Sequence, residues 1–398
     1  MNHRKNILYI FHVSNIGGGS YCLLNMVKKL DREFFNPIIL LKNEGPLCDE
    51  LKKLGAIVII ENSISTVPYN KSIFNILSIK QIYLILISLK KVKYWIKKTD
   101  ADIIHINTMM MYPYAIHAHT LGRKVVVHVR EHWPKGKHQI QFKIAKKLIQ
   151  LYSDKIIAIN ATSAEMIGIL PKTQVIYDWI DFENRDESID LRKIFGDDFK
   201  NLKIFLFLGG IHNIKGSLEI FEVIYNDISY KDIRLLVVGC QNKLIIYKRL
   251  RRIKKLILRF FNYYSYLEKA KSIAQKEERI VFIPSTYQVK SLIEQSFCVV
   301  SFFTIPHANL PLAEAIWLGK PSIAANTPEA NEYSDGGKAA LLFTMKDKDD
   351  FKNKILFALE NEALINENAI NGMSNIQEKF DPIRNSELLN KIYKKLVS

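Results

Sequence analysis

One acidic residue stands among apolar neighbours in the stretch PHANLPLAEAIWLGKPSIAAN, residues 306–326, which predicts a loop, a helix, a turn and a short strand. A helix that starts near Leu310 or Pro311 would place this acid, Glu314, in its first turn, where a carboxylate interacts favourably with the helix dipole. The alternative is functional, because a carboxylate at the carboxyl edge of a parallel sheet can accept hydrogen bonds from two ribose hydroxyls. The stretch by itself leaves both interpretations open.

A glycine-rich loop, SNIGGGS at residues 14–20, lies between an apolar run and a helical pattern. Gly17, Gly18 and Gly19 would let a ligand approach the backbone closely, and the start of the helix offers free N–H groups to an anion. The loop does not match the dinucleotide fingerprint GxGxxG, because Cys22 stands where the last glycine would be. A phosphate-binding loop and a tight turn without a ligand are the two alternatives.

A second loop, GGIHNIKGS at residues 209–217, occupies the corresponding place in the second half of the chain. Lys215 precedes a predicted helix, where its amine could neutralise a diphosphate while the helix N-terminus supplies N–H donors. A solvated lysine is the alternative. The position directly after the first strand of a second α/β half favours the binding role.

Two weaker patterns contain further polar residues. HVREHW brings Arg130 and Glu131 to the end of a predicted strand, a usual place for site residues in α/β folds, whereas His128 is predicted to be buried and structural. The acids at residues 347–349 resemble a metal-binding DxD, but KDKDDFKNKIL is better explained as a capped helix start. No GxSxG or HExxH motif occurs, and we expect no metal.

The composition is typical of a globular protein, with 48% hydrophobic and 24% charged residues among 398. This length predicts two domains. Four cysteines lie far apart without a CxxC pair, which argues against disulfides and zinc and favours a reducing cytoplasm.

The net charge of +17 indicates an anionic partner. Residues 243–259 contain eight Lys or Arg interleaved with apolar residues and no acid, which is typical of a membrane-surface helix or of an ordinary helix with a basic face. No nucleic-acid module surrounds this segment, and no nucleic-acid partner is expected. The longest apolar window, residues 82–89, is too short to span a bilayer and predicts a buried helix.

Apolar runs alternate with helical patterns in both halves of the chain. Because the runs are continuously apolar, they indicate α/β domains with parallel sheets covered on both faces. We predict an N-terminal domain over residues 1–185 and a C-terminal domain over residues 200–380. The polar stretch 183–201 is the predicted linker, and a last helix covers residues 382–398.

In this order the motifs resemble those of the retaining GT-B glycosyltransferases of family 4, over nearly the whole chain. The resemblance rests on the glycine loop with LLNMVKKL, on DIIHIN, VHVREHW and SDKIIAIN, on LGGIHNIKGSLEIFEVI, and on ANLPLAEAIWLGKPSIAANTPEANEYSDGGKAALLF. The last block is the most specific. The resemblance implies a GT-B fold, with two Rossmann-like domains, a cleft between them, and a C-terminal helix that crosses back to the acceptor-side N-terminal domain.

The resemblance also implies roles for particular residues. Glu314 would be the second acid of an E-x7-E motif and bind the nucleotide ribose, and Lys215 would hold the donor diphosphate without a metal or cofactor. The implied donor-binding residues are Glu314, Gly17, Gly18, Gly19, Gly210, Ala308, Asn309 and Leu310, and the implied catalytic residues are Lys215, Arg130 and Glu131.

The chain departs from the family pattern at several positions. Pro306 stands where the first acid of E-x7-E is expected, and Gly210 stands where an arginine is expected. Arg130 replaces a histidine, and Ala308 and Asn309 replace a glycine-aromatic pair. The missing acid leaves the identity of the donor sugar open, and Arg130 could compensate for the missing cation.

We therefore expect a hexosyltransferase that moves a sugar from a nucleotide-diphosphate donor to a lipid-linked or polysaccharide acceptor in bacterial surface-polysaccharide synthesis. The acceptor and the basic segment indicate a cytoplasmic protein, peripheral on the inner face of the plasma membrane. A nucleotide-sugar epimerase of the same fold is one alternative. A non-catalytic partner of a transferase is another, suggested by Pro306 and Gly210.

Overall fold

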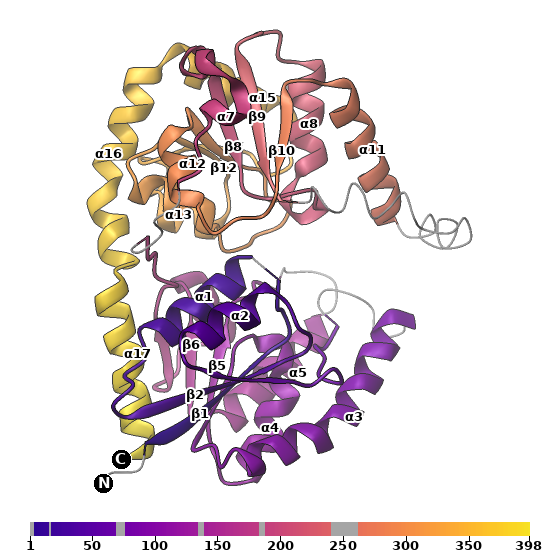
Figure 1. The fold of residues 1–398 in the computed structure, drawn as a ribbon, viewed down its shortest axis with the longest axis vertical. Helices are drawn as coiled ribbons and strands as arrows, with labels where there is room; N and C mark the ends of the chain where they lie inside the picture. Colours follow the sequence, from indigo (N-terminus) through magenta and orange to yellow (C-terminus); the bar gives the residue numbers. More distant parts are fainter. Residues whose placement is uncertain (1–3, 16, 69–75, 134–138, 183–187, 240–261) are drawn as a thin grey trace. The chain divides into compact units, whose positions relative to one another are not determined.

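The computed structural model describes residues 4–15, 17–68, 76–133, 139–182, 188–239 and 262–398. The chain divides into two compact units, Met1–Asp181 with Lys379–Ser398, and Phe182–Glu378. Each unit contains one parallel sheet with helices on both faces (Figure 1). These two Rossmann-like halves confirm the predicted α/β fold class.

The first unit contains seven parallel strands in the order β3-β2-β1-β4-β5-β6-β7. The strands are β1 Lys5–Phe11, β2 Phe35–Leu41, β3 Ile57–Ile60, β4 Ile103–Ile106, β5 Lys124–Val129, β6 Lys155–Ala158 and β7 Thr173–Val175. The helices are α1 Gly18–Lys28, α2 Pro46–Lys53, α3 Ile76–Lys98, the 3-10 helix η1 Met109–Met111, α4 Tyr112–Thr120, α5 Gln139–Tyr152, α6 Ala161–Ile167 and α17 Pro382–Val397.

Successive residues of β1 belong to different cores, because side chains alternate across a strand. Leu8 and Ile10 pack with residues of α3, α4 and α5 on one face of the sheet. Ile7 and Tyr9 pack with residues of α1, α2 and α17 on the other face. Both faces therefore need apolar side chains, which explains the continuous apolar runs in the sequence.

The C-terminal helix α17 completes the first unit, as predicted. Its Tyr393 is fully buried against the rings of Tyr9 and Phe35, with centroid distances of 6.4 and 5.8 Å. Asn390 Nδ2 donates to Lys29 O at 2.9 Å, and Asn390 Oδ1 accepts from Asp31 N at 3.0 Å. The chain thus returns to its first domain at its end.

Helix α3 corrects one prediction. Ile85, Ser88 and Val92 on one side of α3 are buried, but Tyr83 and Leu86 on the other side are exposed. The apolar window 82–89 is therefore only half buried, and the prediction of a buried helix is wrong. Apolar composition predicted burial, but one helix on the face of a sheet buries only the stripe that contacts the sheet.

The second unit contains six parallel strands in the order β10-β9-β8-β11-β12-β13. The strands are β8 Lys203–Phe207, β9 Ile233–Val238, β10 Ile280–Ile283, β11 Cys298–Ser301, β12 Ser322–Ala325 and β13 Leu341–Phe343. The helices are α7 Arg192–Phe195, η2 Asp197–Asn201, η3 Asn213–Lys215, α8 Ser217–Asn226, α11 Asn262–Lys276, α12 Val289–Gln295, α13 Leu310–Trp317, α14 Pro328–Tyr333, α15 Lys348–Glu360 and α16 Glu362–Lys379.

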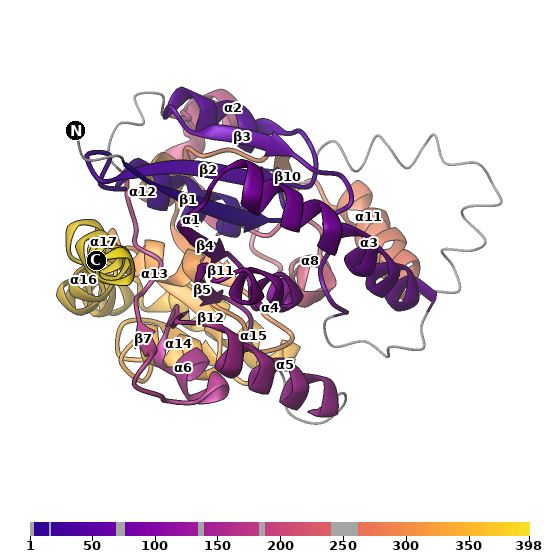
Figure 2. The same cartoon turned by 90° about the horizontal axis from the view of Figure 1, so that it is seen from below.

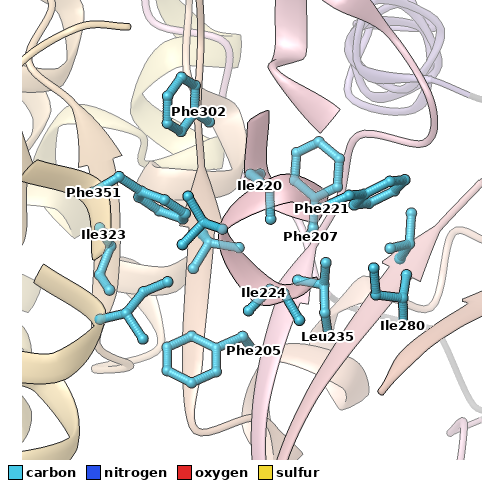
Figure 3. Packing of buried hydrophobic residues seen from close by; sticks show 14 of the residues in the cluster. Phe205, Phe207, Ile220, Phe221, Ile224, Leu235, Ile280, Phe302, Ile323 and Phe351 are labelled. Atoms are coloured by element: carbon cyan, nitrogen blue, oxygen red, sulfur yellow. The ribbon is translucent and has the colours of Figure 1, made fainter. Parts of the chain in front are cut away.

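One face of this second sheet has an aromatic core (Figure 3). Phe205 from β8 and Leu235 from β9 pack there with Phe221 from α8. Phe302, just after β11, meets Phe351 of α15 edge to face, with ring centroids 5.1 Å apart. This dense packing fixes the strand ends from which the neighbouring loops depart.

The predicted linker is partly incorporated into the second unit. Leu191 is fully buried in the core between the sheet, α12 and α13, and its backbone N donates to Gln295 Oε1 at 3.1 Å. Residues 192–201 form α7 and η2. Apolar residues spaced through a polar stretch, such as Ile189 and Phe199, explain why it packs.

Two points concern membranes. The basic segment 243–259 lies outside the described residues. Among the residues that the structure describes, no helix combines the length and apolar character that a membrane span requires.

Candidate functional site

Two loops of the second unit meet at the carboxyl edge of its sheet, where β8 and β11 are neighbours. Thr304 N, after β11, donates to Ile214 O at 2.9 Å, and Thr304 Oγ1 donates to Asn213 O at 3.0 Å. The strand order changes direction between β8 and β11, and open α/β sheets bind ligands at such a point.

Gly216 makes the close approach of these loops feasible. Its φ is +68°, a left-handed conformation that L side chains rarely adopt. A Cβ placed on it would lie 2.1 Å from Phe302 O. The glycine in the sequence HNIKGS is therefore required by contact with the second loop as well as by its own backbone.

Lys215 is the last residue of η3 and directly precedes the turn into α8, as predicted. It is half-buried, and its Nζ donates to Leu208 O at 3.2 Å, just beyond the end of β8. Gly210, in the same loop, is buried and has a φ of +57°. The amine thus lies at the carboxyl edge of the sheet, beside the N-terminus of α8.

Glu314 lies in the second turn of α13, and the prediction of a first-turn position is wrong. The helix begins at Leu310 with Pro311 in its first turn, so Glu314 is the fifth helical residue. Its side chain is only 4% exposed, between the buried neighbours Ala313 and Ala315. A favourable helix-dipole position therefore does not explain this buried carboxylate.

The residues before Glu314 form the start of α13. Asn309 caps the helix, because its Oδ1 accepts from Leu312 N at 3.3 Å and from Ser301 Oγ at 3.0 Å. Ala308 and Leu310 flank it and are half-buried. The Asn309 side chain thus stabilises the loop, whereas the backbone at the helix start points its N–H groups along the helix axis.

Glu329 is a buried acid that the sequence reasoning missed. It lies in the first turn of α14, just after β12, and its side chain is fully buried. Thr327 caps this helix by accepting from Ala330 N at 3.2 Å. The sequence contained a signal for this helix start. The residues Thr327, Pro328 and Glu329 follow an apolar strand and match a cap residue, a first-turn proline and a first-turn acid.

In the first unit the glycine loop leads directly into α1. Gly17 is the N-terminal cap residue, and α1 begins at Gly18. A Cβ on Gly17 or Gly18 would meet no atom within 4 Å, whereas one on Gly19 would lie 3.2 Å from the ring of Phe11. Packing within this unit therefore explains the third glycine but not the first two, which favours close approach by a ligand.

Arg130 lies just after β5 and is held in a buried network. Its Nε and Nη2 donate to Asn107 Oδ1 at 3.2 and 3.1 Å, and Nη1 donates to the Asp178 carboxylate. The side chains of Arg130 and Asp178 are 8% and 15% exposed. The guanidinium is thus committed to partners in its own unit, which sequence position alone did not indicate.

Glu131 caps the 3-10 helix η1. Its carboxylate accepts from Thr108 Oγ1 and, at 3.0 Å, from Met109 N. Burial raises the pKa of Glu131, and the hydrogen bonds from Thr108 and Met109 oppose that rise. These contacts place Glu131 at the carboxyl edge of β4 and β5, next to Arg130.

His128 is buried, as predicted. Its Nδ1 lies 3.3 Å from His105 Nε2, and His105 Nδ1 lies 2.6 Å from Tyr393 OH. Burial and the nearby Arg130 lower the pKa of His105 to about 3, and they lower the pKa of His128 well below 6.5. Both imidazoles are neutral at pH 7 and act as parts of the core.

The DKD sequence is a helix cap, as predicted. Asp347 Oδ1 accepts from Asp349 N and Asp350 N, both at 3.0 Å, at the start of α15. The Asp347 carboxylate thus accepts hydrogen bonds from backbone N–H groups of the first helical turn.

A groove of about 650 Å³ lies elsewhere in the first unit, at the amino ends of β1, β2 and β3. Arg4, Arg32 and Lys98 line it together with Trp95 and Ile57. Ligands of open parallel sheets bind at the carboxyl ends of the strands. This groove is therefore separate from the predicted site residues.

Comparison with protein families identifies the two halves. The model described as Glycosyltransferase Family 4 matches residues 16–184, and the model described as Glycosyl transferases group 1 matches residues 202–361. The two matches together cover most of the chain. The chain is a two-domain glycosyltransferase.

Solved structures share the fold of this glycosyltransferase. HepE of Anabaena, crystallised with UDP and glucose, is 19% identical over 98% of this chain and 100% of its own, with a TM-score of 0.75. Sucrose-phosphate synthase from Thermosynechococcus elongatus is 13% identical over 99% of both chains, with a TM-score of 0.74. A putative UDP-N-acetylglucosamine 2-epimerase from Listeria monocytogenes is 13% identical over 92% of this chain and 91% of its own, with a TM-score of 0.62.

At these identities the likeness shows the GT-B fold alone. No curated protein matches the sequence. In each unit of the glycosyltransferase, the predicted residues gather at the carboxyl edge of a sheet. Lys215 and Gly210 follow β8, and residues 308–314 follow β11. Gly17 and its neighbours follow β1, and Arg130 follows β5.

Proposed function

We propose that this glycosyltransferase transfers a hexose from a nucleotide-diphosphate sugar and retains the anomeric configuration. The observation that supports the proposal is the joined pair of loops after β8 and β11, which presents Lys215, the start of α13 and the buried Glu314 at the switch point of one sheet. The complex of the similarly folded HepE with UDP and glucose supports a nucleotide-sugar donor.

The proposed chemistry depends on charge at the leaving group. A nucleoside diphosphate gains negative charge as the sugar departs, and Lys215 with the N–H groups at the starts of α8 and α13 would stabilise it. Glu314 would accept hydrogen bonds from the ribose hydroxyls. The amides of Gly17 and Gly18 at the start of α1 would offer further N–H groups to an anionic group.

Arg130 and Glu131 have a different place in the proposal. Arg130 is buried with Asp178, and Glu131 holds η1, so both would act by positioning the loops after β4 and β5. These loops would form the acceptor side of the site. No side chain is assigned as a nucleophile, and neither a metal nor another cofactor is required in this mechanism.

The acceptor is proposed to be a lipid-linked or polysaccharide intermediate of bacterial surface-polysaccharide synthesis. A cytoplasmic enzyme peripheral on the inner membrane would meet such a substrate, and the excess of basic residues is consistent with an anionic surface. Residues 243–259 were the predicted contact with that surface.

The variant Glu314→Gln tests the donor role. Glutamine preserves the shape of the buried side chain but cannot accept both ribose hydrogen bonds as a carboxylate does, so donor affinity and transfer should fall about 100-fold or more. The measurement is a thermal-shift screen over nucleoside diphosphates and their sugars, followed by transfer assays with the donor that raises the melting temperature of the wild type.

The matched control is Glu268→Gln, which changes an exposed acid on α11. Near-normal turnover of Glu314→Gln would contradict the assignment. Sugar epimerisation without an acceptor would support the epimerase instead. Donor binding without turnover on any acceptor extract would support a non-catalytic partner, the outcome suggested by Pro306 and Gly210.

A further inference from the structure

Helix α3 has two apolar sides, of which one is buried and the other is exposed among the residues that the structure describes. The side that contains Ile85, Val92 and Ile96 belongs to the core of the first unit. Figure 2 shows α3 at the periphery of that unit, in purple. A surface helix normally pairs one apolar side with a polar one, so the second apolar side needs an explanation.

The outward side is an uninterrupted apolar stripe at helical spacing. Its members are exposed in the protein and recur three or four residues apart: Ile79, Ile82, Tyr83, Leu86 and Ile87. Tyr83 and Leu86 are 61% and 62% exposed. Single exposed apolar residues are normal, but a contiguous stripe indicates an interaction surface.

Basic residues continue the stripe along the same helix. Five exposed lysines occupy the last three turns of α3: Lys90, Lys91, Lys93, Lys97 and Lys98. Tyr94 is exposed among them, and Lys98 Nζ lies 5.4 Å from the centre of its ring. The helix thus pairs a half whose exposed side chains are apolar except for Lys80 with a cationic half.

Acidic residues near α3 are confined to loops in the part of the chain that the structure describes, such as Asp100 after α3 and Glu61, which accepts from Trp95 Nε1. The three helices that cover this face of the sheet, α3, α4 and α5, contain no Asp or Glu. α5 also exposes Ile140 and Ile144 next to exposed Lys143. A partner for this surface must therefore be anionic and must also accept apolar side chains, and these are the properties of an anionic bilayer surface.

We propose that α3 docks the protein on an anionic phospholipid bilayer. The stripe from Ile79 to Ile87 enters the boundary between headgroups and acyl chains, and the lysines from Lys90 to Lys98 bind lipid phosphates. This assigns the membrane contact to the first domain, in addition to the segment 243–259 considered from the sequence. It does not depend on the donor chemistry of the second domain.

The test is cosedimentation of the full chain with vesicles. One set contains phosphatidylcholine only, and the other contains phosphatidylcholine and phosphatidylglycerol in equal amounts. The wild type should sediment with the anionic vesicles, and added salt should weaken its binding. The double variant Tyr83→Gln/Leu86→Gln should bind at least about tenfold more weakly, because two large apolar side chains no longer enter the interface. Lys90→Gln/Lys97→Gln should also weaken binding, but only to anionic vesicles.

The matched control is Leu364→Gln/Ile370→Gln, which changes two exposed apolar residues on α16 of the second unit, a helix that contains acids. It should bind as the wild type does. Unchanged binding by the α3 variants would overturn the proposal, as would loss of binding only when the bases of 243–259 are neutralised. A wild-type dimer that becomes monomeric in Tyr83→Gln/Leu86→Gln, without vesicle binding by the wild type, would assign the stripe to a second copy and also overturn it. Nucleotide-induced thermal shifts of all variants report separately on the donor site.

Discussion

At the residue scale, the buried pair of Arg130 and Asp178 changes how the first domain is understood. Arg130 was expected to supply a cation for a diphosphate, but its three nitrogens contact Asn107, Asp178 and the sulfur of Met26. A buried guanidinium that loses its carboxylate partner keeps the cost of desolvation without the attraction. The pair is therefore a strong determinant of stability when only one member is altered.

We predict that Asp178→Asn lowers the free energy of unfolding by about 3–5 kcal/mol, because it leaves the Arg130 charge buried without a countercharge. The double variant Arg130→Met/Asp178→Leu should recover most of this loss, since apolar residues of similar size replace both charges. Urea denaturation measures both. A single variant as stable as the wild type would show that Arg130 reaches solvent or a ligand instead.

At the element scale, the joint between the loops after β8 and β11 decides where Lys215 lies. Its backbone hydrogen bonds start at Thr304, and its closest approach is between Gly216 and Phe302. Both loops follow strands that the aromatic core holds in place. The contact between the loops therefore fixes the position of the site residues relative to the core. A defect in the joint should therefore affect binding as well as stability.

We predict that Gly216→Ala destabilises the second domain by about 1–3 kcal/mol more than Gly336→Ala, because its Cβ must displace Phe302. The two glycines have φ values of +68° and +69°, but a Cβ on Gly336 would meet no atom within 4 Å. Gly336→Ala therefore shows the backbone cost alone, about 1–2 kcal/mol. Thermal unfolding with and without a nucleoside diphosphate measures the stability and the ligand binding of each variant. Equal losses of stability in the two variants would show that the loops move apart to accommodate the added Cβ.

At the scale of the whole molecule, buried imidazoles should make the stability of the first domain depend on pH. The first domain buries imidazoles that are neutral in the folded state. Burial and Lys42 lower the pKa of His12 to about 4, and burial and Arg130 lower the pKa of His105 to about 3. The unfolded chain binds these protons near pH 6.5, so stability is complete above that pH and is lost as the pH falls toward 4.

We predict that the unfolding free energy of the first domain falls by about 1.4 kcal/mol per pH unit for each of these histidines below pH 6.5. His12→Gln should reduce this slope by about 1.4 kcal/mol per pH unit, because unfolding then takes up one proton fewer. Tryptophan fluorescence during urea titrations follows the first domain, because Trp95, Trp133 and Trp179 lie there and Trp317 lies in the second. A slope that His12→Gln leaves unchanged would show that His12 titrates normally in the folded protein.

The sequence by itself determined most of the architecture. Continuous apolar runs, helical spacing and glycines at strand ends are local signals, and they predicted the strands, the position of Lys215 before a helix and a last helix over residues 382–398. Capping signals correctly predicted Asp347 at the start of α15. These features depend on neighbours within a few residues, which the sequence displays directly.

Only the tertiary structure decided which charged residues have a partner within the protein and which apolar residues are buried. Asp178 is 48 positions from Arg130, and the strand order that brings the two together has no local signature. The same holds for α3, since apolar residues on both of its sides look alike in sequence, and only the sheet beneath decides which side is covered. Glu314 remained ambiguous because the sequence predicted the start of α13 near Leu310 but not the burial of the acid, the fifth helical residue, which is only 4% exposed. Burial and pairing are long-range properties, and they turn a pattern of residue types into a site.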